Sequence, residues 1–180
     1  MNAAAYVGER AILEEEVEAR VAALRTGPLA ARLPRSETAD GRNLRRWVVQ
    51  VMTHEAVIEA EAAALGLRVD GGGAGETLTL PAAMRMGGVA AAVLARSPLA
   101  REVRRHVTAG VEVPDEEIRA YFERNPDRAG TPGEAQRLRR EAADRAFALW
   151  LARRHAALVR LMPGFEHPAD PRHADAAHRH

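Results

Sequence analysis

The stretch from Asn43 to Leu65 constrains the fold of this chain more than any other. Apolar side chains recur along it at alternating steps of four and three, the spacing that places them on one face of an α-helix. They are Leu44, Val48, Val51, Ile58, Ala62 and Leu65. Gly66 follows directly, as expected of a glycine that ends a helix. The pattern predicts a central helix with its apolar face in the core.

One position on that face holds a carboxylate. Glu55 falls between Val51 and Ile58, where an apolar residue is expected, and His54 precedes it. A buried carboxylate needs a partner, and an ion pair or hydrogen bond with an arginine from another helix would supply one. The alternative is catalysis, because a desolvated carboxylate beside a histidine can act as a general acid or base. Glu55 and His54 are therefore the candidate catalytic residues.

The composition favours helices along the whole chain. Hydrophobic residues make up 47% of the 180 residues and aromatic residues only 4%. Such an alanine-rich composition suits closely packed helices better than a sheet. We expect an all-α fold with one helical domain at residues 1–164, a flexible linker at 70–76 and an irregular His/Pro-rich tail at 165–180. The apolar run Ala3–Val7 is interpreted as a brief extended segment, too short to form a sheet.

Missing residue types exclude several chemistries. The chain has no cysteine and no lysine, since all 26 basic side chains are arginine. Thiol catalysis, disulfides and lysine Schiff bases are therefore excluded.

The net charge of +1, with basic and acidic residues interleaved, argues against a nucleic-acid partner. We find neither a signal peptide nor an apolar run of membrane-spanning length, and expect a cytoplasmic protein that binds no membrane.

Helical patterns also cover residues 13–25, 81–110 and 134–162. The second is interrupted at Gly87-Gly88 and at Ser97-Pro98, so it could form two helices. Arg101, Arg104 and Arg105 make a basic edge there, which is either an ordinary solvated face or a site for phosphate or an acidic partner.

The stretch VPDEEIRAYFERNPDR, residues 113–128, has the start and stop signals of a short helix. Acids follow Pro114 at its beginning, and Asn125-Pro126 ends it. Ile118, Tyr121 and Phe122 fall on one face, which needs a partner. We expect this face to pack on the helix at 134–162.

Three segments resemble the helical chaperone domain of SurA-type and other parvulin-associated proteins. YVGERAI at residues 6–12 looks like the family's short strand and turn, which usually read V-N-G-E-x-I, although the asparagine is absent. The run from Glu55 to Leu67 resembles the family's long helix, and residues 113–127 resemble its V-x-D-E-E-I-x-x-Y-x-x-N stretch. The resemblance implies a SurA-like helical bundle, without the parvulin isomerase domain that follows this stretch in relatives.

Two functions from different classes fit these observations. The first is a chaperone-like accessory module that binds a peptide, a protein or a second copy of itself, without prolyl isomerase activity, in a bacterial biosynthetic pathway. Its partner would enter an apolar groove between the helices, lined by Trp47, Val51, Ile58, Tyr121, Phe122 and Trp150. The second is a small tailoring enzyme of secondary metabolism that uses Glu55 and His54, or a metal. The first needs no cofactor.

The tail supplies the metal alternative. Four of the seven histidines lie in it, beside Glu166, Asp170 and Asp175, and imidazole with carboxylate can bind a divalent metal. The histidines are His167, His173, His178 and His180. Their spacing matches no established ligand motif, so a polar tail packed along the helices, with Phe165 as its anchor, is the other interpretation.

Elemental analysis separates these interpretations. A metal site in the tail predicts a stoichiometric metal in the purified protein that disappears when residues 166–180 are removed. A protein that is free of metal and unaffected by that truncation would contradict the metal form of the enzyme hypothesis.

Overall fold

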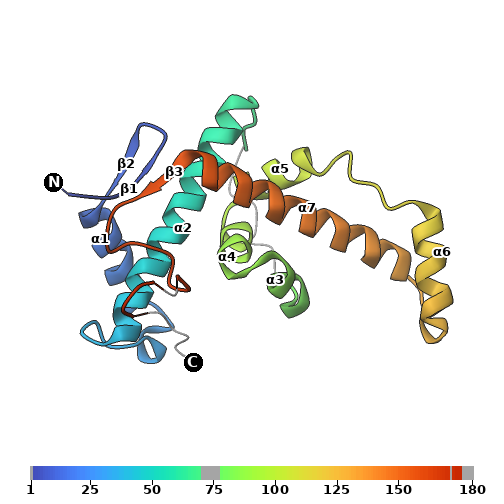
Figure 1. Cartoon of the computed structure of the whole chain (residues 1–180), viewed down its shortest axis with the longest axis horizontal. Coiled ribbons are helices and arrows are strands. Elements are labelled where there is room, and N and C mark those ends of the chain that lie inside the picture. The colour runs from blue at the N-terminus through green and yellow to red at the C-terminus, as the bar shows by residue number, and fades with distance from the viewer. Residues whose placement is uncertain (1, 70–77, 171, 176–180) are drawn as a thin grey trace. The chain divides into compact units, whose positions relative to one another are not determined.

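A computed structural model describes residues 2–69, 78–170 and 172–175, and the described part is mostly helical with a small sheet (Figure 1). The chain forms two compact units, Met1–Ala64 with Arg154–His180, and Leu65–Arg153. The single domain expected over residues 1–164 thus corresponds to two units, and the linker expected at 70–76 lies outside the described residues. No described helix is long and apolar enough to cross a membrane.

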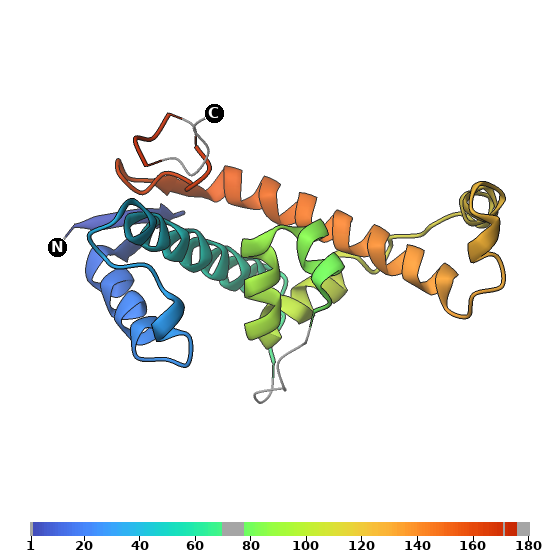
Figure 2. The ribbon, with the colours of Figure 1, turned by 90° about the horizontal axis from the view of Figure 1, so that it is seen from below.

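The first unit contains β1 (Ala3–Val7), β2 (Arg10–Leu13), α1 (Glu14–Arg25), the 3-10 turn η1 (Ala30–Arg32), α2 (Ala39–Ala64) and β3 (Val159–Leu161). The second contains α3 (Leu80–Met86), α4 (Gly88–Arg96), α5 (Pro98–Val107), α6 (Asp115–Arg124) and η2 (Pro126–Arg128). Helix α7 (Glu134–Leu158) belongs to the second unit as far as Arg153. Figure 2 shows the same ribbon after a rotation of 90° about the horizontal axis.

The expectation of a helical fold is confirmed for most of the described residues, but the fold is not purely α, because β1 lies at the centre of a three-stranded antiparallel sheet in the order β2-β1-β3. Tyr6 pairs with Ala11 on one side and with Arg160 on the other. Gly8, with a φ of 57°, makes the turn between β1 and β2. The apolar run at residues 3–7 could not form a sheet alone, but it obtains partners on both edges. One partner is more than 150 residues away along the chain, in a segment whose sequence continues the helical pattern.

Helix α2 confirms the central apolar stripe. Val48, Val51, Ile58 and Ala62 are almost completely buried, and Gly66 follows the helix with a φ of 67°. Leu65, at the end of the stripe, is 40% exposed. The interruption at Glu55 is an ion pair with Arg20 of α1, at 2.9 Å between Nη2 and Oε1. The expected pairing with an arginine from another helix is confirmed.

In the second unit, the two expected interruptions give three short helices. Gly87, with a φ of 85°, separates α3 from α4, and Ser97 caps α5 by accepting a hydrogen bond from the N–H of Ala100 at 3.1 Å. Buried residues of α4 and α5 form the core: Ala90, Ala91, Val93, Leu94, Ala100 and Val103. Met84, which the pattern placed on the apolar side, is 75% exposed.

Helix α6 has the predicted bounds, and its apolar face meets α7. Ile118 is buried, and the Tyr121 hydroxyl donates to Glu134 of α7 at 2.9 Å. Contact of this face with the last long helix is confirmed for Tyr121.

Gly41, near the start of α2, provides a test of the packing in the first unit. A β-carbon there would lie 2.0 Å from the carbonyl oxygen of Arg35 and 2.8 Å from that of Ser36. Glycine to alanine normally stabilises a helix, but this clash is with backbone, which cannot move aside easily. We expect Gly41→Ala to lower the free energy of unfolding by about 2–3 kcal/mol in urea denaturation.

Gly88→Ala is the matched control, because a β-carbon at Gly88 meets no atom within 4 Å. It should be neutral or stabilise by about 0.5 kcal/mol. Similar effects of the two substitutions would contradict the close approach at Gly41.

Candidate functional site

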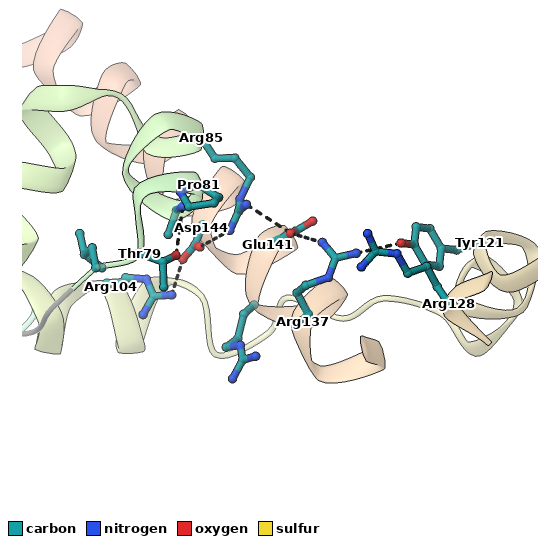
Figure 3. A pocket seen from close by; sticks show the side chains of 12 residues that line it. Thr79, Pro81, Arg85, Arg104, Tyr121, Arg128, Arg137, Glu141 and Asp144 are labelled. Carbon is teal, nitrogen blue, oxygen red and sulfur yellow. Dashed lines mark hydrogen bonds and ion pairs between the residues drawn. The ribbon is translucent and has the colours of Figure 1, made fainter. Parts of the chain in front are cut away.

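An arginine-lined pocket of about 670 Å³ lies in the second unit (Figure 3). Its wall comes from the segment before α3 and from α3, α5, α6, η2 and α7. The lining residues are Leu78, Thr79, Pro81, Ala82, Arg85, Arg104, Tyr121, Arg128, Arg137, Arg140, Glu141 and Asp144. We call this the arginine pocket.

Helix α7 supplies the longest wall of the arginine pocket. Arg140, Glu141 and Asp144 follow Arg137 by three, four and seven residues, so all four lie on one face of the helix. Opposite them, Thr79 caps α3 by accepting a hydrogen bond from the N–H of Ala82 at 3.4 Å. The charged face of α7 thus faces side chains from several segments.

Two carboxylates of α7 hold three of the arginines in place, as Figure 3 shows. Asp144, whose side chain is 7% exposed, pairs with Arg104 of α5 and lies 3.6 Å from Arg85 of α3. Arg85 also lies 3.2 Å from Glu141, which pairs with Arg137 one turn earlier on α7. These shared ion pairs fix α3 and α5 against α7 and reduce the freedom of each guanidinium.

A second group of hydrogen bonds attaches α6 to the same wall. Arg137 donates to both oxygens of Glu134, at 2.6 Å and 2.9 Å, and to the Tyr121 hydroxyl at 2.9 Å. Hydrogen bonds from Arg137 and then Tyr121 lower the pKa of Glu134 to about 2. The hydrogen bond to Glu134 raises the pKa of Tyr121. Glu134 therefore remains a carboxylate and Tyr121 a neutral phenol at physiological pH.

Positive charge remains after these pairs are counted. Arg85, Arg104 and Arg137 are matched by Glu134, Glu141 and Asp144. Two lining arginines are not matched in this way. Among the described residues, Arg128 pairs with its neighbour Asp127 alone, at 3.6 Å, and the two side chains are 55% and 77% exposed. Arg140 is exposed and makes no ion pair within the part of the chain that the structure describes.

This arrangement suits binding of an anion better than catalysis. Guanidinium groups donate paired hydrogen bonds to carboxylate or phosphate oxygens and do not release protons at physiological pH. The two lining carboxylates are already engaged by arginines, and Thr79 serves as a helix cap. Arg128 and Arg140 remain available to a ligand.

The candidate catalytic residues lie in the first unit and have separate partners. Glu55 binds Arg20, whereas the His54 ring stacks on the ring of His155, with centroids 4.0 Å apart. Nδ1 of His54 lies 2.6 Å from the carbonyl oxygen of Gln50. Burial lowers the pKa of His54 and lowers the pKa of His155 to about 4. Both rings are therefore neutral at physiological pH.

The six candidate groove residues are divided between the units. Val51 and Ile58 are buried and Trp47 is half-buried in the first unit. In the second unit, Trp150 stacks near Phe147, with centroids 5.9 Å apart. Tyr121 lines the arginine pocket, and Phe122 lines a hollow of about 560 Å³ with Ile118 and Ala135.

The tail histidines that the structure describes do not form a metal cluster with their neighbours. His167 is exposed, and Nδ1 of His173 lies 2.5 Å from Nη1 of Arg46. Within residues 2–69, 78–170 and 172–175, no group of three or more His, Asp or Glu side chains is placed to hold a metal ion. His178 and His180 lie outside the described residues. The tail instead packs along α2, as the second interpretation expected, and Phe165 is 5% exposed at its start.

Sequence reasoning identified only part of the arginine pocket. Arg104 was singled out in the basic edge and Tyr121 on the face of α6, but the arginines of α3, η2 and α7 were not. A usable signal was present on α7, where arginines and acids alternate at helical spacing from Glu134 to Asp144. It predicts a charged face but does not indicate which segments face it.

Comparison with known proteins gives one partial match. Residues 3–40 match the model of a family described as a family of unknown function (DUF7158). The match covers β1, β2 and α1 and no residue of the arginine pocket. No curated protein and no solved structure matches the chain. The assignment of a function therefore depends on the chemistry of the molecule.

The stacked histidines predict that stability falls in mild acid. Between the folded pKa of about 4 and the ordinary value of 6.5, the unfolded chain binds a proton at His155 that the folded chain does not. The folded chain therefore has its full stability, as far as His155 is concerned, above pH 6.5, and it loses stability progressively as the pH falls towards 4. Because the ring is partly exposed, solvent screens the effect, and we expect unfolding in urea to become easier by about 1 kcal/mol between pH 7 and pH 5.

His155→Gln is the control, because the amide can still bond Thr53, which lies 3.0 Å from Nε2 of His155, and does not titrate. Its stability should change less over the same pH interval. An equal change in the variant would assign the pH dependence to other groups.

Proposed function

We propose that this chain is an accessory module that binds a peptide or protein through an acidic segment of the partner, received in the arginine pocket. The observation that carries the proposal is the charge of Arg128, which is paired only across an exposed 3.6 Å contact with Asp127, and of Arg140, beside a framework of paired arginines. A cationic pocket with fixed walls favours a carboxylate ligand, because little freedom is lost when the ligand binds.

The neighbouring hollow supports a peptide as the ligand. It is lined by α6 and α7, with an apolar surface from Ile118, Phe122 and Ala135 and charged side chains at Asp115, Arg119, Glu123 and Arg139. The arginine pocket shares α6 with it through Tyr121. Ala135 and Arg139 lie on the opposite face of α7 from the residues of that helix that line the arginine pocket, so only a partner that extends around α6 and α7 could contact both sites, whereas a small inorganic anion would use only the first.

The resemblance to SurA-type helical domains supports the same class of function, a chaperone-like module without an isomerase domain. It is carried by the segments at residues 6–12, 55–67 and 113–127. We also propose that the module serves a bacterial biosynthetic pathway.

The enzyme alternative has less support. Glu55 and His54 bind Arg20 and His155 respectively, so the pair is not arranged as an acid and base that share a substrate. We therefore assign no reaction to them.

Fluorescence anisotropy with a labelled peptide of alternating glutamate and leucine tests the proposal. Arg128→Ala and Arg140→Ala should each weaken binding about five- to tenfold, which is ~1–1.4 kcal/mol. Neither arginine belongs to the ion-pair framework, so circular dichroism should be unchanged. Added salt should weaken binding further, because both side chains are exposed.

Arg145→Ala is the matched control, since Arg145 is an exposed arginine of α7 that does not line the pocket. It should leave the affinity unchanged, and a lysine-leucine peptide should not bind. If Arg145→Ala and Arg140→Ala lowered the affinity equally, the binding would come from general charge attraction and not from the arginine pocket. Undetectable binding of the acidic peptide would contradict the proposal.

A further inference from the structure

Arg46 of α2 is a buried cation whose partners lie in the tail. It is 2% exposed. Its Nε donates to the carbonyl oxygen of Glu166 and its Nη2 to that of His167, each at 2.9 Å, while Nη1 lies 2.5 Å from Nδ1 of His173. Among residues that the structure describes, no carboxylate forms an ion pair with Arg46. The buried charge is therefore stabilised largely by main-chain oxygen atoms of the tail.

An arrangement of this kind is unusual for an arginine, because buried charges are normally paired with opposite charges. A guanidinium has five N–H donors in a planar fork and needs acceptors when water is excluded. If the tail moved away, Arg46 would lose these acceptors and would again require oxygen atoms from water or from another chain. The position of Arg46 thus favours occupation of this surface by a polypeptide.

Neighbouring side chains of α2 bind further carbonyl groups of the tail. The Gln50 amide donates to the carbonyl oxygen of Phe165 at 3.5 Å, and the Asn43 amide donates to that of Asp175 at 2.8 Å. Asn43, Arg46 and Gln50 are spaced three and four residues apart, so they form one stripe along the helix. Every peptide has carbonyl groups, so these contacts do not depend on the tail's own sequence.

Two other contacts do depend on sequence. Phe165 is 5% exposed, and the guanidinium of Arg45 lies 4.7 Å from its ring centre. Asp175, ten residues later, receives two hydrogen bonds from Arg42, at 2.6 Å from Nε and 2.7 Å from Nη2. An aromatic residue and a carboxylate therefore anchor the two ends of the bound segment, and the carbonyl contacts lie between them.

The described tail has the character of a bound peptide. It contains no helix or strand after β3, and both views show it beside the N-terminal half of α2 (Figures 1 and 2). Apart from Phe165, its described residues are half-buried or exposed. Because the tail is held mainly by polar contacts and most of its own residues are near solvent, it can open locally without unfolding the sheet or α2.

We propose that the stripe of α2 formed by Arg42, Asn43, Arg45, Arg46 and Gln50 is a peptide-binding site, occupied in this structure by the tail as an internal ligand. The external ligand is a peptide that carries an aromatic residue followed ten positions later by a carboxylate. The site is independent of the arginine pocket, which belongs to the other unit. Because the tail is attached to the chain, it acts at high effective concentration. An external peptide therefore displaces it only when the affinity and concentration of that peptide are high enough.

Fluorescence anisotropy with the labelled peptide PGFEHPADPRHAD, which copies residues 163–175, tests the proposal on the full chain. Asp175→Ala removes the tail's contact with Arg42 and leaves α2 unchanged. The peptide should bind this variant at least tenfold more tightly than it binds the unaltered chain, because the internal ligand competes less well. Equal affinities, or no binding to the variant, would show that the tail is a permanent part of the fold and would overturn the proposal.

A charge exchange locates the bound peptide. Arg42 is 52% exposed, so Arg42→Glu should not disturb folding, unlike replacement of the buried Arg46. In the Asp175→Ala chain, Arg42→Glu should weaken binding of the peptide about tenfold, and a peptide ending in lysine should recover most of that loss. If the lysine peptide bound no better, or if Arg42→Glu had no effect, the peptide would lie elsewhere and the assignment to α2 would be wrong.

Discussion

The pairing of β1 with both β2 and β3 is the interaction on which the first unit depends. It joins residues near the start of the chain to residues beyond α7. The N–H of Gly8 bonds the carbonyl of Leu158 at 2.8 Å, and the N–H of Met162 bonds the carbonyl of Ala4 at 3.0 Å. These bonds continue the pairing at both ends of β3, so α7 ends where the sheet begins. They also fix the point from which the tail starts towards α2.

Arginine performs several different tasks in this molecule. Arg85 of α3 bridges two carboxylates of α7 and thereby holds the two helices together, whereas Arg137 binds two carboxylates of its own helix and the Tyr121 hydroxyl of α6. Arg46 binds main-chain oxygens inside the first unit. Lysine could not replace Arg46 in this geometry, because a single ammonium cannot present a planar fork of donors. An arginine-only composition, which looks like a bias in the sequence, thus supplies much of the specific geometry of the structure.

The helices could be predicted because the residues that specify each of them lie close together in the sequence. The stripe of α2, the glycine after it and the start and stop of α6 all lie within short stretches of sequence. The ion pair of Glu55 was also predictable in kind, because burial of a carboxylate demands a partner. The sheet was not predictable, since Val159, Arg160 and Leu161 continue the helical pattern and become a strand only by pairing with β1. The arginine pocket was missed for a similar reason, because its charges come from four elements and a single sequence does not show which of them meet.

The first unit is made from two segments of the chain, with the whole second unit between them. During synthesis, β1 and β2 emerge early, but the partner for the other edge of β1 is made only after residues 65–153. Until then that edge offers free hydrogen-bonding groups, which in other proteins are a common starting point for misassembly. The order of synthesis therefore gives the second unit time to fold first, and makes β3 the segment whose arrival completes the sheet.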